Sequence, residues 1–351
     1  MSIGSVRLSS GEKIEFISNM HTMLKAGIPI LNGVESLLED SKGNVKKILV
    51  ALRQDLIAGR RMCTTLAKFP ESFDKVTVNL VKAAEEAGTL EQTLQDIKKN
   101  TQAEMEFSDK VKSALTYPLF VFLIFAAVMG VMLFVVMPKI TQVFSRLKVD
   151  IPLPTRFLMF LSDFVIKNTL YVGIGTLLFV VFMYFLYNRK RRFLLGVIAK
   201  VPIIAPLFKK VDIVRFSRSM GLLLSSGIPI VNALELSIDV VNRRDLKNLL
   251  IKSKDMIYAG QEFSQGLKGQ RGSVMPVLVI KLIELGEASG TLEKAMADVT
   301  EYMDYEVSKN LKTLTTLLEP VMLVFVGLLV GGVMLSIISP MYSMIGQVGS
   351  R

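Results

Sequence analysis

The sequence predicts an all-α membrane protein with two homologous cytoplasmic helical-bundle domains and three transmembrane helices. Three observations lead to this fold class. Of the 351 residues, 51% are hydrophobic, and the apolar residues gather in three long uncharged segments. Two stretches in the first third of the chain return about 200 residues later with the same residues at the same spacing. No stretch alternates polar and apolar residues as a strand would.

The three apolar segments each contain 19 consecutive residues without a charge. A helix of that length extends about 28 Å, which is enough to cross the hydrocarbon core of a bilayer. The alternative is a helix buried in a protein core, but such helices rarely run so far without a charge. We therefore expect transmembrane helices at residues 119–138, 169–187 and 321–340.

Lys and Arg indicate the orientation of these helices. Residues 188–192 carry four positive charges directly after the second apolar segment. Because positively charged flanks remain on the cytoplasmic side, we expect domains 1–118 and 188–320 to be cytoplasmic. The connector 139–168 and the tail 341–351 are then extracytoplasmic. The N-terminus lacks the apolar segment of a signal peptide, so the first transmembrane helix is expected to direct insertion.

We attribute the net charge of +11 mainly to Lys and Arg that lie at the edge of the membrane. Juxtamembrane Lys and Arg attract anionic lipid headgroups, so membrane lipids are expected partners. Nucleic-acid binding would need a basic stripe with stacking aromatic side chains, and the sequence has none, so no nucleic-acid partner is expected.

The connector 139–168 has an amphipathic second half. Pro152 and Pro154 break the chain, and Thr155 is placed to cap a short helix with Phe157, Phe160, Leu161 and Phe164 on one face. Such a helix is expected to lie in the membrane interface. A simple linker back into the membrane is the alternative.

The internal repeat consists of two shared motifs. Residues 16–37 read FISNMHTMLKAGIPILNGVESL, and residues 216–237 read FSRSMGLLLSSGIPIVNALELS. Residues 80–97 read LVKAAEEAGTLEQTLQDI, and residues 282–299 read LIELGEASGTLEKAMADV. The repeat therefore predicts two related helical bundles.

Prolines recur at the predicted ends of two transmembrane helices. Pro118 and Pro320 stand where the first and third helices begin, and Pro138 and Pro340 stand where they end. The sequence thus predicts that each bundle leads into a membrane helix bracketed by prolines.

Glycines mark the corners of each bundle. In the GIPI motif, Gly27 is suited to the left-handed conformation that ends a helix, and Pro29 to the first turn of the next. Gly227 and Pro229 repeat this pair. Further corners are expected at Gly59, Gly88, Gly260 and Gly290.

Catalytic chemistry is not expected. The chain has no Walker-type phosphate-binding loop, no GxSxG motif and no HExxH motif. His21 is the only histidine and Cys63 the only cysteine, so we predict no catalytic, cofactor or metal site. The apolar segments contain no ionisable residue, which argues against an ion or proton pathway.

Acidic residues beside the shared glycines are candidates for binding a partner. These are Glu85 and Glu86 near Gly88, and Glu287 near Gly290. A docking contact and a solvated helix face are equally compatible with the sequence.

Small residues in the apolar segments are candidates for helix packing. Gly327 and Gly331 form a GxxxG pair, and Ala126 with Gly130 forms a weaker one. Such faces let two helix backbones approach closely, within one chain or between chains.

Taken together, these motifs resemble the type II secretion F / PilC family of inner-membrane platform proteins. The resemblance covers almost the whole chain and is carried by the duplicated GIPI motif and the AGTLE and SGTLE turns. It is also carried by KVKSALTYP at 110–118, VVMP at 135–138 and DIPLPT at 150–155. Members of the family often have several tens of residues before the first repeat, whereas here Phe16 already begins it.

The resemblance implies a non-enzymatic platform in the bacterial inner membrane. Its implied partners are a hexameric assembly ATPase, pilin or pseudopilin subunits, other inner-membrane assembly proteins and further copies of the chain. The platform would couple the ATPase to insertion of subunits into a type IV pilus or a type II secretion filament. The alternatives are a transporter or channel subunit and a membrane-anchored scaffold.

Overall fold

The computed structural model describes residues 6–136, 205–269 and 274–348, with isolated positions between 138 and 178 and at 272. Within these residues the chain forms helices joined by short turns, and no strand occurs among them. The all-α prediction is therefore confirmed for this part of the chain. Contacts divide the protein into two units, Met1–Lys110 with Pro202–Ser308, and Val111–Val201 with Lys309–Arg351.

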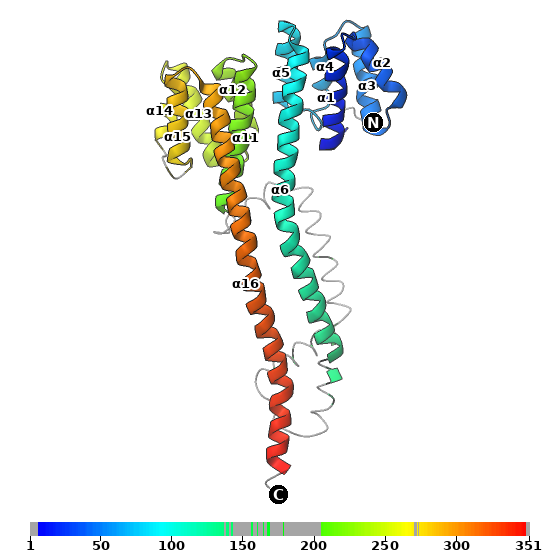
Figure 1. The fold of residues 1–351 in the computed structure, drawn as a ribbon, viewed down its shortest axis with the longest axis vertical. Helices are drawn as coiled ribbons and strands as arrows, with labels where there is room; N and C mark the ends of the chain where they lie inside the picture. Colours follow the sequence, from blue (N-terminus) through cyan, green and yellow to red (C-terminus); the bar gives the residue numbers. More distant parts are fainter. Residues whose placement is uncertain are drawn as a thin grey trace. The chain divides into compact units, whose positions relative to one another are not determined.

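The two repeats build the same series of helices (Figure 1). The first repeat forms α1 (Ser10–Lys25), α2 (Ile30–Asp40), α3 (Gly43–Ile57), α4 (Met62–Leu66), α5 (Lys75–Ala87) and α6 (Leu90–Val131). The second forms α11 (Ala205–Ser225), α12 (Ile230–Asp239), α13 (Arg244–Tyr258), α14 (Phe263–Lys268), α15 (Val277–Ala288) and α16 (Leu292–Val348).

The predicted glycine corners are confirmed. All six glycines have a positive φ: Gly27, Gly59, Gly88, Gly227, Gly260 and Gly290. At the first corner the N–H of Ile28 donates to the carbonyl of Met23 at 3.0 Å, and the N–H of Gly27 donates to Leu24 at 2.9 Å. This pair of bonds is a Schellman turn, which needs a left-handed residue and therefore favours glycine.

Each bundle has its own apolar core. Phe16 and Met20 of α1 are buried, and so are their counterparts Phe216 and Met220 of α11. The ring of Phe16 lies 5.6 Å from that of Phe73, centroid to centroid. Burying one such side chain contributes roughly 1.5–3 kcal/mol, so the helical spacing of these residues explains why α1 and α11 pack inward.

Three of the four predicted boundary prolines lie inside continuous helices. Pro118 lies inside α6, and Pro320 and Pro340 lie inside α16, which continues to Val348. A helix that continues past a proline does not show where it enters or leaves the membrane, so the prediction that prolines mark the membrane boundaries stays a prediction. The proline ring fixes φ near the helical value and removes one backbone hydrogen bond, while the long helix on either side keeps its own.

One helix among the described residues is long and apolar enough to cross a membrane, Leu292–Leu328 within α16. A shorter apolar stretch, Leu123–Val136, covers the end of α6 and the π-helical turn Met132–Val136 that follows it. The predicted helix 169–187 and the connector helix near Phe157 lie outside the residues described as continuous segments. Three membrane crossings therefore remain a prediction.

Within the second unit, aromatic rings join the two long helices. The rings of Phe125 and Phe325 lie 4.8 Å apart, tilted by 54°. A Cβ added at Gly130, Gly327 or Gly331 would meet no described atom within 4 Å. The close backbone packing expected at these glycines is therefore not seen among the described residues, where bulky rings make the contact instead.

Candidate functional site

The two corner glutamates hold short helices inside their own bundles. The carboxylate of Glu85 accepts the backbone N–H of Met62 at 2.6 Å and that of Cys63 at 3.1 Å. These are the first two residues of α4, whose first-turn N–H groups have no partner within the helix. A carboxylate at this end also interacts favourably with the helix dipole.

The second repeat contains the same arrangement. The carboxylate of Glu287 accepts the N–H of Phe263 at 2.5 Å and that of Ser264 at 2.8 Å, at the start of α14. Sequence reasoning weighed a docking contact against a solvated face and missed this internal role. The signal was present, because each glutamate recurs together with a short helix that begins just after a corner glycine.

The remaining corner residues are more exposed. Glu86 forms an ion pair with Arg61 at 2.8 Å, and both side chains are about half exposed. Gly88 and Gly290 end α5 and α15 in the left-handed conformation. Of the three candidate carboxylates, only that of Glu86 is held by a side chain rather than by backbone N–H groups.

A buried carboxylate joins α3 to α4 in the first repeat. The Asp55 side chain is only 2% exposed and contacts Arg60 and Lys68, each at 2.5 Å. The hydroxyl of Thr65 donates to it at 2.7 Å. Burial opposes ionisation of Asp55, but hydrogen bonds from Lys68 and Thr65 and the nearby positive charges outweigh it and lower its pKa.

His21 and Cys63 both lie in surroundings that suit a structural role. The Nδ1 atom of His21 lies 3.1 Å from the carbonyl of Glu91, so the ring links α1 to the start of α6. Cys63 is buried, and burial followed by the Glu85 carboxylate raises the pKa of its thiol. A raised pKa disfavours the thiolate that a nucleophile or metal ligand requires. The described residues also contain no group of three or more His, Cys, Asp or Glu that would hold a metal ion.

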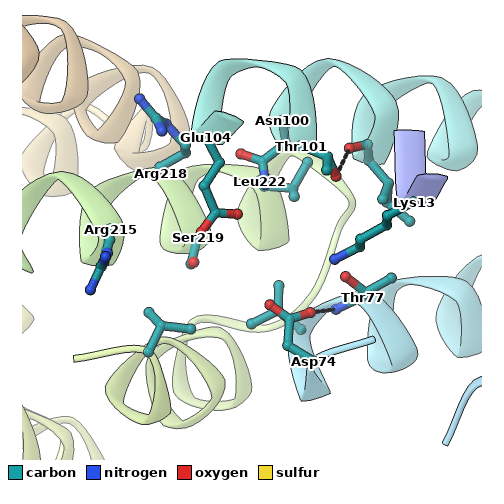
Figure 2. Close-up of a pocket in the computed structure, with 13 residues that line it drawn as sticks. Lys13, Asp74, Thr77, Asn100, Thr101, Glu104, Arg215, Arg218, Ser219 and Leu222 are labelled. Atoms are coloured by element: carbon teal, nitrogen blue, oxygen red, sulfur yellow. Dashed lines mark hydrogen bonds between the residues drawn. The ribbon is translucent and has the colours of Figure 1, made fainter. Parts of the chain in front are cut away.

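A polar pocket in the first unit is lined by residues of both repeats (Figure 2). Residues of both charges line it, including Lys13, Asp74, Glu104, Arg215 and Arg218. Asp74 accepts the N–H of Thr77 at 2.9 Å and thereby caps α5, a bond drawn in Figure 2. Part of the pocket wall therefore serves to hold helix α5 in place.

Two side-chain contacts join the repeats near this pocket. The guanidinium of Arg218 in α11 lies 5.5 Å from the ring centre of Phe107 in α6, a contact between the second and the first repeat. Within the second repeat, the same guanidinium pairs with Asp304 of α16 at 2.7 Å. Lys75 of α5 pairs with Asp239 of α12 at 2.7 Å. The hydrogen bond and charge of Asp239 raise the pKa of Lys75.

Comparison with known families gives a match over most of the chain. The family described as "Type II secretion system (T2SS), protein F" matches residues 16–138 and 216–340. These ranges begin at Phe16 and Phe216 and end at Pro138 and Pro340, the landmarks of the internal repeat.

Individual relatives match nearly the full length. The type IV pilus assembly protein PilC of Thermus thermophilus is 31% identical, over 94% of this chain and 82% of that protein. The protein of the same name from Myxococcus xanthus is 28% identical, over 95% and 80%. The type II secretion system protein F of Pseudomonas aeruginosa is 27% identical, over 93% and 81%. The chain belongs to the family of type II secretion system protein F, as the duplicated motifs predict.

Proposed function

We propose that this chain is a non-enzymatic platform in the bacterial inner membrane. It couples a cytoplasmic hexameric assembly ATPase to the insertion of pilin or pseudopilin subunits into a type IV pilus or a type II secretion filament. The observation that carries the proposal is the duplicated bundle leading in each copy into a long helix, in a chain whose relatives are named as pilus assembly and secretion proteins. Its other partners are inner-membrane assembly proteins, lipids and further copies of itself.

The proposed topology has three crossings, with the N-terminus in the cytoplasm and the C-terminus outside. The two crossings between the bundles return the chain to the side on which it began, so both bundles occupy the cytoplasm with the ATPase, and the third crossing places the C-terminus outside. The apolar helix Leu292–Leu328 supports the last crossing. Single cysteines in a Cys63→Ala background, labelled in intact cells by a membrane-impermeant maleimide, test the topology. A cysteine at position 349 is expected to react, and one at position 42 is not.

The exposed part of the acidic corner is proposed to contact a partner. Glu85 and Glu287 act indirectly by holding α4 and α14, whereas the half-exposed carboxylate of Glu86 is accessible. Gly88 and Gly290 shape the two turns. A charge reversal at Glu287 would disturb α14 as well as any partner, so Glu86→Lys is the cleaner probe.

Co-purification from filament-producing cells tests both proposals. The full chain is expected to recover the assembly ATPase, and Glu86→Lys is expected to recover several-fold less. Glu71→Lys, a reversal at another exposed acidic residue, serves as the matched control. Equal recovery with all three chains would remove the corner as a contact. No ATPase with the unaltered chain would contradict the platform itself.

A further inference from the structure

The third helix of each bundle carries the same surface stripe of cationic and apolar side chains. Helices α3 and α13 each have 15 residues, and the same four positions have the same chemistry in both. Stripe 1 consists of Lys46, Val50, Arg53 and Ile57, and stripe 2 consists of Lys247, Ile251, Lys254 and Tyr258. Steps of four, three and four residues place side chains along one face of a helix.

The apolar members of the stripes are exposed to the same extent. Val50 is 39% exposed and Ile251 is 38% exposed. Ile57 is 61% exposed and Tyr258 is 67% exposed. One exposed apolar residue is ordinary on a protein surface, but folding does not require the same exposed pair in both bundles.

Each stripe places a cation between its two apolar residues. Arg53 pairs with Glu35 of α2 at 2.9 Å. Lys254 lies 3.8 Å from Glu235 of α12, at the corresponding position of the second repeat. The neighbouring helix therefore orients the same charge in both copies, and the arrangement includes two helices rather than one.

Nearby exposed positions differ between the copies. Gln54 on α3 corresponds to Asp255 on α13, and Lys47 corresponds to Asn248. Leu285 of α15 is 67% exposed, and its counterpart in the first repeat is Ala83. The chemistry of the stripes has thus been kept while the surface around them has changed.

We propose that the two stripes are copies of one docking surface, each binding one subunit of a homo-oligomeric protein through a patch of acidic and apolar side chains. Equal surfaces fit equal partners, and the subunits of a homo-oligomer supply several copies of one patch. The cations of the two stripes attract acidic groups of a partner, although Arg53, Lys247 and Lys254 share their charge with Glu35, Asp239 and Glu235 of the same chain, and the apolar pair anchors the contact. The inference rests on the proposed function, in which this oligomer is the assembly ATPase.

The stripe also continues toward the acidic corner. Arg61, which follows Ile57 beyond the turn at Gly59, is the residue that pairs with Glu86. The exposed corner carboxylate is thus paired with a residue four positions after the end of stripe 1.

Binding between the full chain in lipid nanodiscs and the purified hexameric ATPase of the same filament system tests the proposal. Ile57→Ser and Tyr258→Ser are each expected to weaken binding about tenfold, and the double variant more than a hundredfold, because two linked contacts bind with avidity. Against an ATPase variant that stays monomeric, each single variant is expected to bind half as many subunits as the unaltered chain. Leu285→Ser is the matched control and is expected to bind normally.

The possible results separate the two proposals. Normal binding by the double variant overturns the docking inference and leaves the platform function standing. Dissociation of a dimer of this chain by the double variant, with ATPase binding unchanged, identifies a second copy as the occupant and also overturns it. No binding by the unaltered chain overturns the platform function and this inference with it. Unaltered melting curves of the nanodisc samples establish that the variants are folded.

Discussion

The Glu85 carboxylate lies 2.6 Å from the backbone nitrogen of Met62, at the first residue of α4. Glu287 stands in the same relation to Phe263 at 2.5 Å. The internal repeat is therefore a repeat of polar contacts as well as of helices, and both copies hold their fourth helix by a carboxylate from the fifth.

Glu85→Gln is expected to loosen α4, because it removes a charge that two backbone N–H groups share. Hydrogen bonds to charged groups contribute about 1.5–3 kcal/mol, so local opening should become at least tenfold more frequent. Cys63, the only cysteine, lies at this helix and reports the change. Its labelling rate by a thiol reagent in the folded protein, measured across pH and corrected for the change in thiolate fraction that removing the Glu85 charge causes, is expected to rise at least tenfold.

Glu287→Gln provides the control, because it makes the same change in the other bundle. It is expected to leave the labelling rate of Cys63 unaltered. Equal acceleration by both variants would mean that labelling follows global unfolding, and no acceleration by Glu85→Gln would contradict the capping role.

Asp55 is expected to make stability depend on pH in the acid range. Its pKa in the folded protein lies below the ordinary value of 3.8, so its contribution is fully present above 3.8 and is lost as pH falls through the folded pKa. Asp55→Asn is expected to cost about 1–3 kcal/mol at neutral pH. Thermal melting at a series of pH values should show the gap between the two chains closing below 3.8.

Asp255→Asn changes an exposed aspartate at the end of α13 and should shift the melting temperature little at any pH. A gap between Asp55→Asn and the unaltered chain that persists unchanged at the lowest pH would show that Asp55 does not stabilise the bundle through its charge.

Gly27→Ala is expected to destabilise the first bundle by about 1 kcal/mol, because a Cβ is disfavoured at its φ of +74°. Gly11 lies in α1 with an ordinary helical backbone and open space around it. Gly11→Ala should therefore be neutral or stabilising. Denaturant unfolding followed by circular dichroism measures both, and the opposite order would contradict the turn.

Lys75 and Asp239 are expected to crosslink when both are replaced by cysteine in a Cys63→Ala background. Their charged atoms lie 2.7 Å apart, and a short bismaleimide should join the two repeats within one chain. When the cysteine is introduced at Lys82, two turns further along α5, instead of at Lys75, most of the crosslinked product should be lost. Efficient crosslinking at both positions, or at neither, would contradict this contact between the repeats.

The sequence predicts local features of this fold well and contacts between distant residues poorly. The corners at Gly27 and Gly227 follow from residues within a few positions of each other. The role of Glu85 depends on a helix that starts 23 residues earlier, which no local pattern reveals. The stripes needed the structure as well, because periodicity alone does not say which face of α3 and α13 is covered. Pro118 lies inside the continuous helix α6, so the local sequence pattern at this proline does not by itself locate an end of the helix.

Crosslinking in native membranes of filament-producing cells, followed by pull-down of this chain and mass spectrometry, tests the central claim most directly. The platform account predicts that a hexameric assembly ATPase and a pilin or pseudopilin are recovered together with the chain. Recovery of neither, while the same cells assemble filaments, would contradict it.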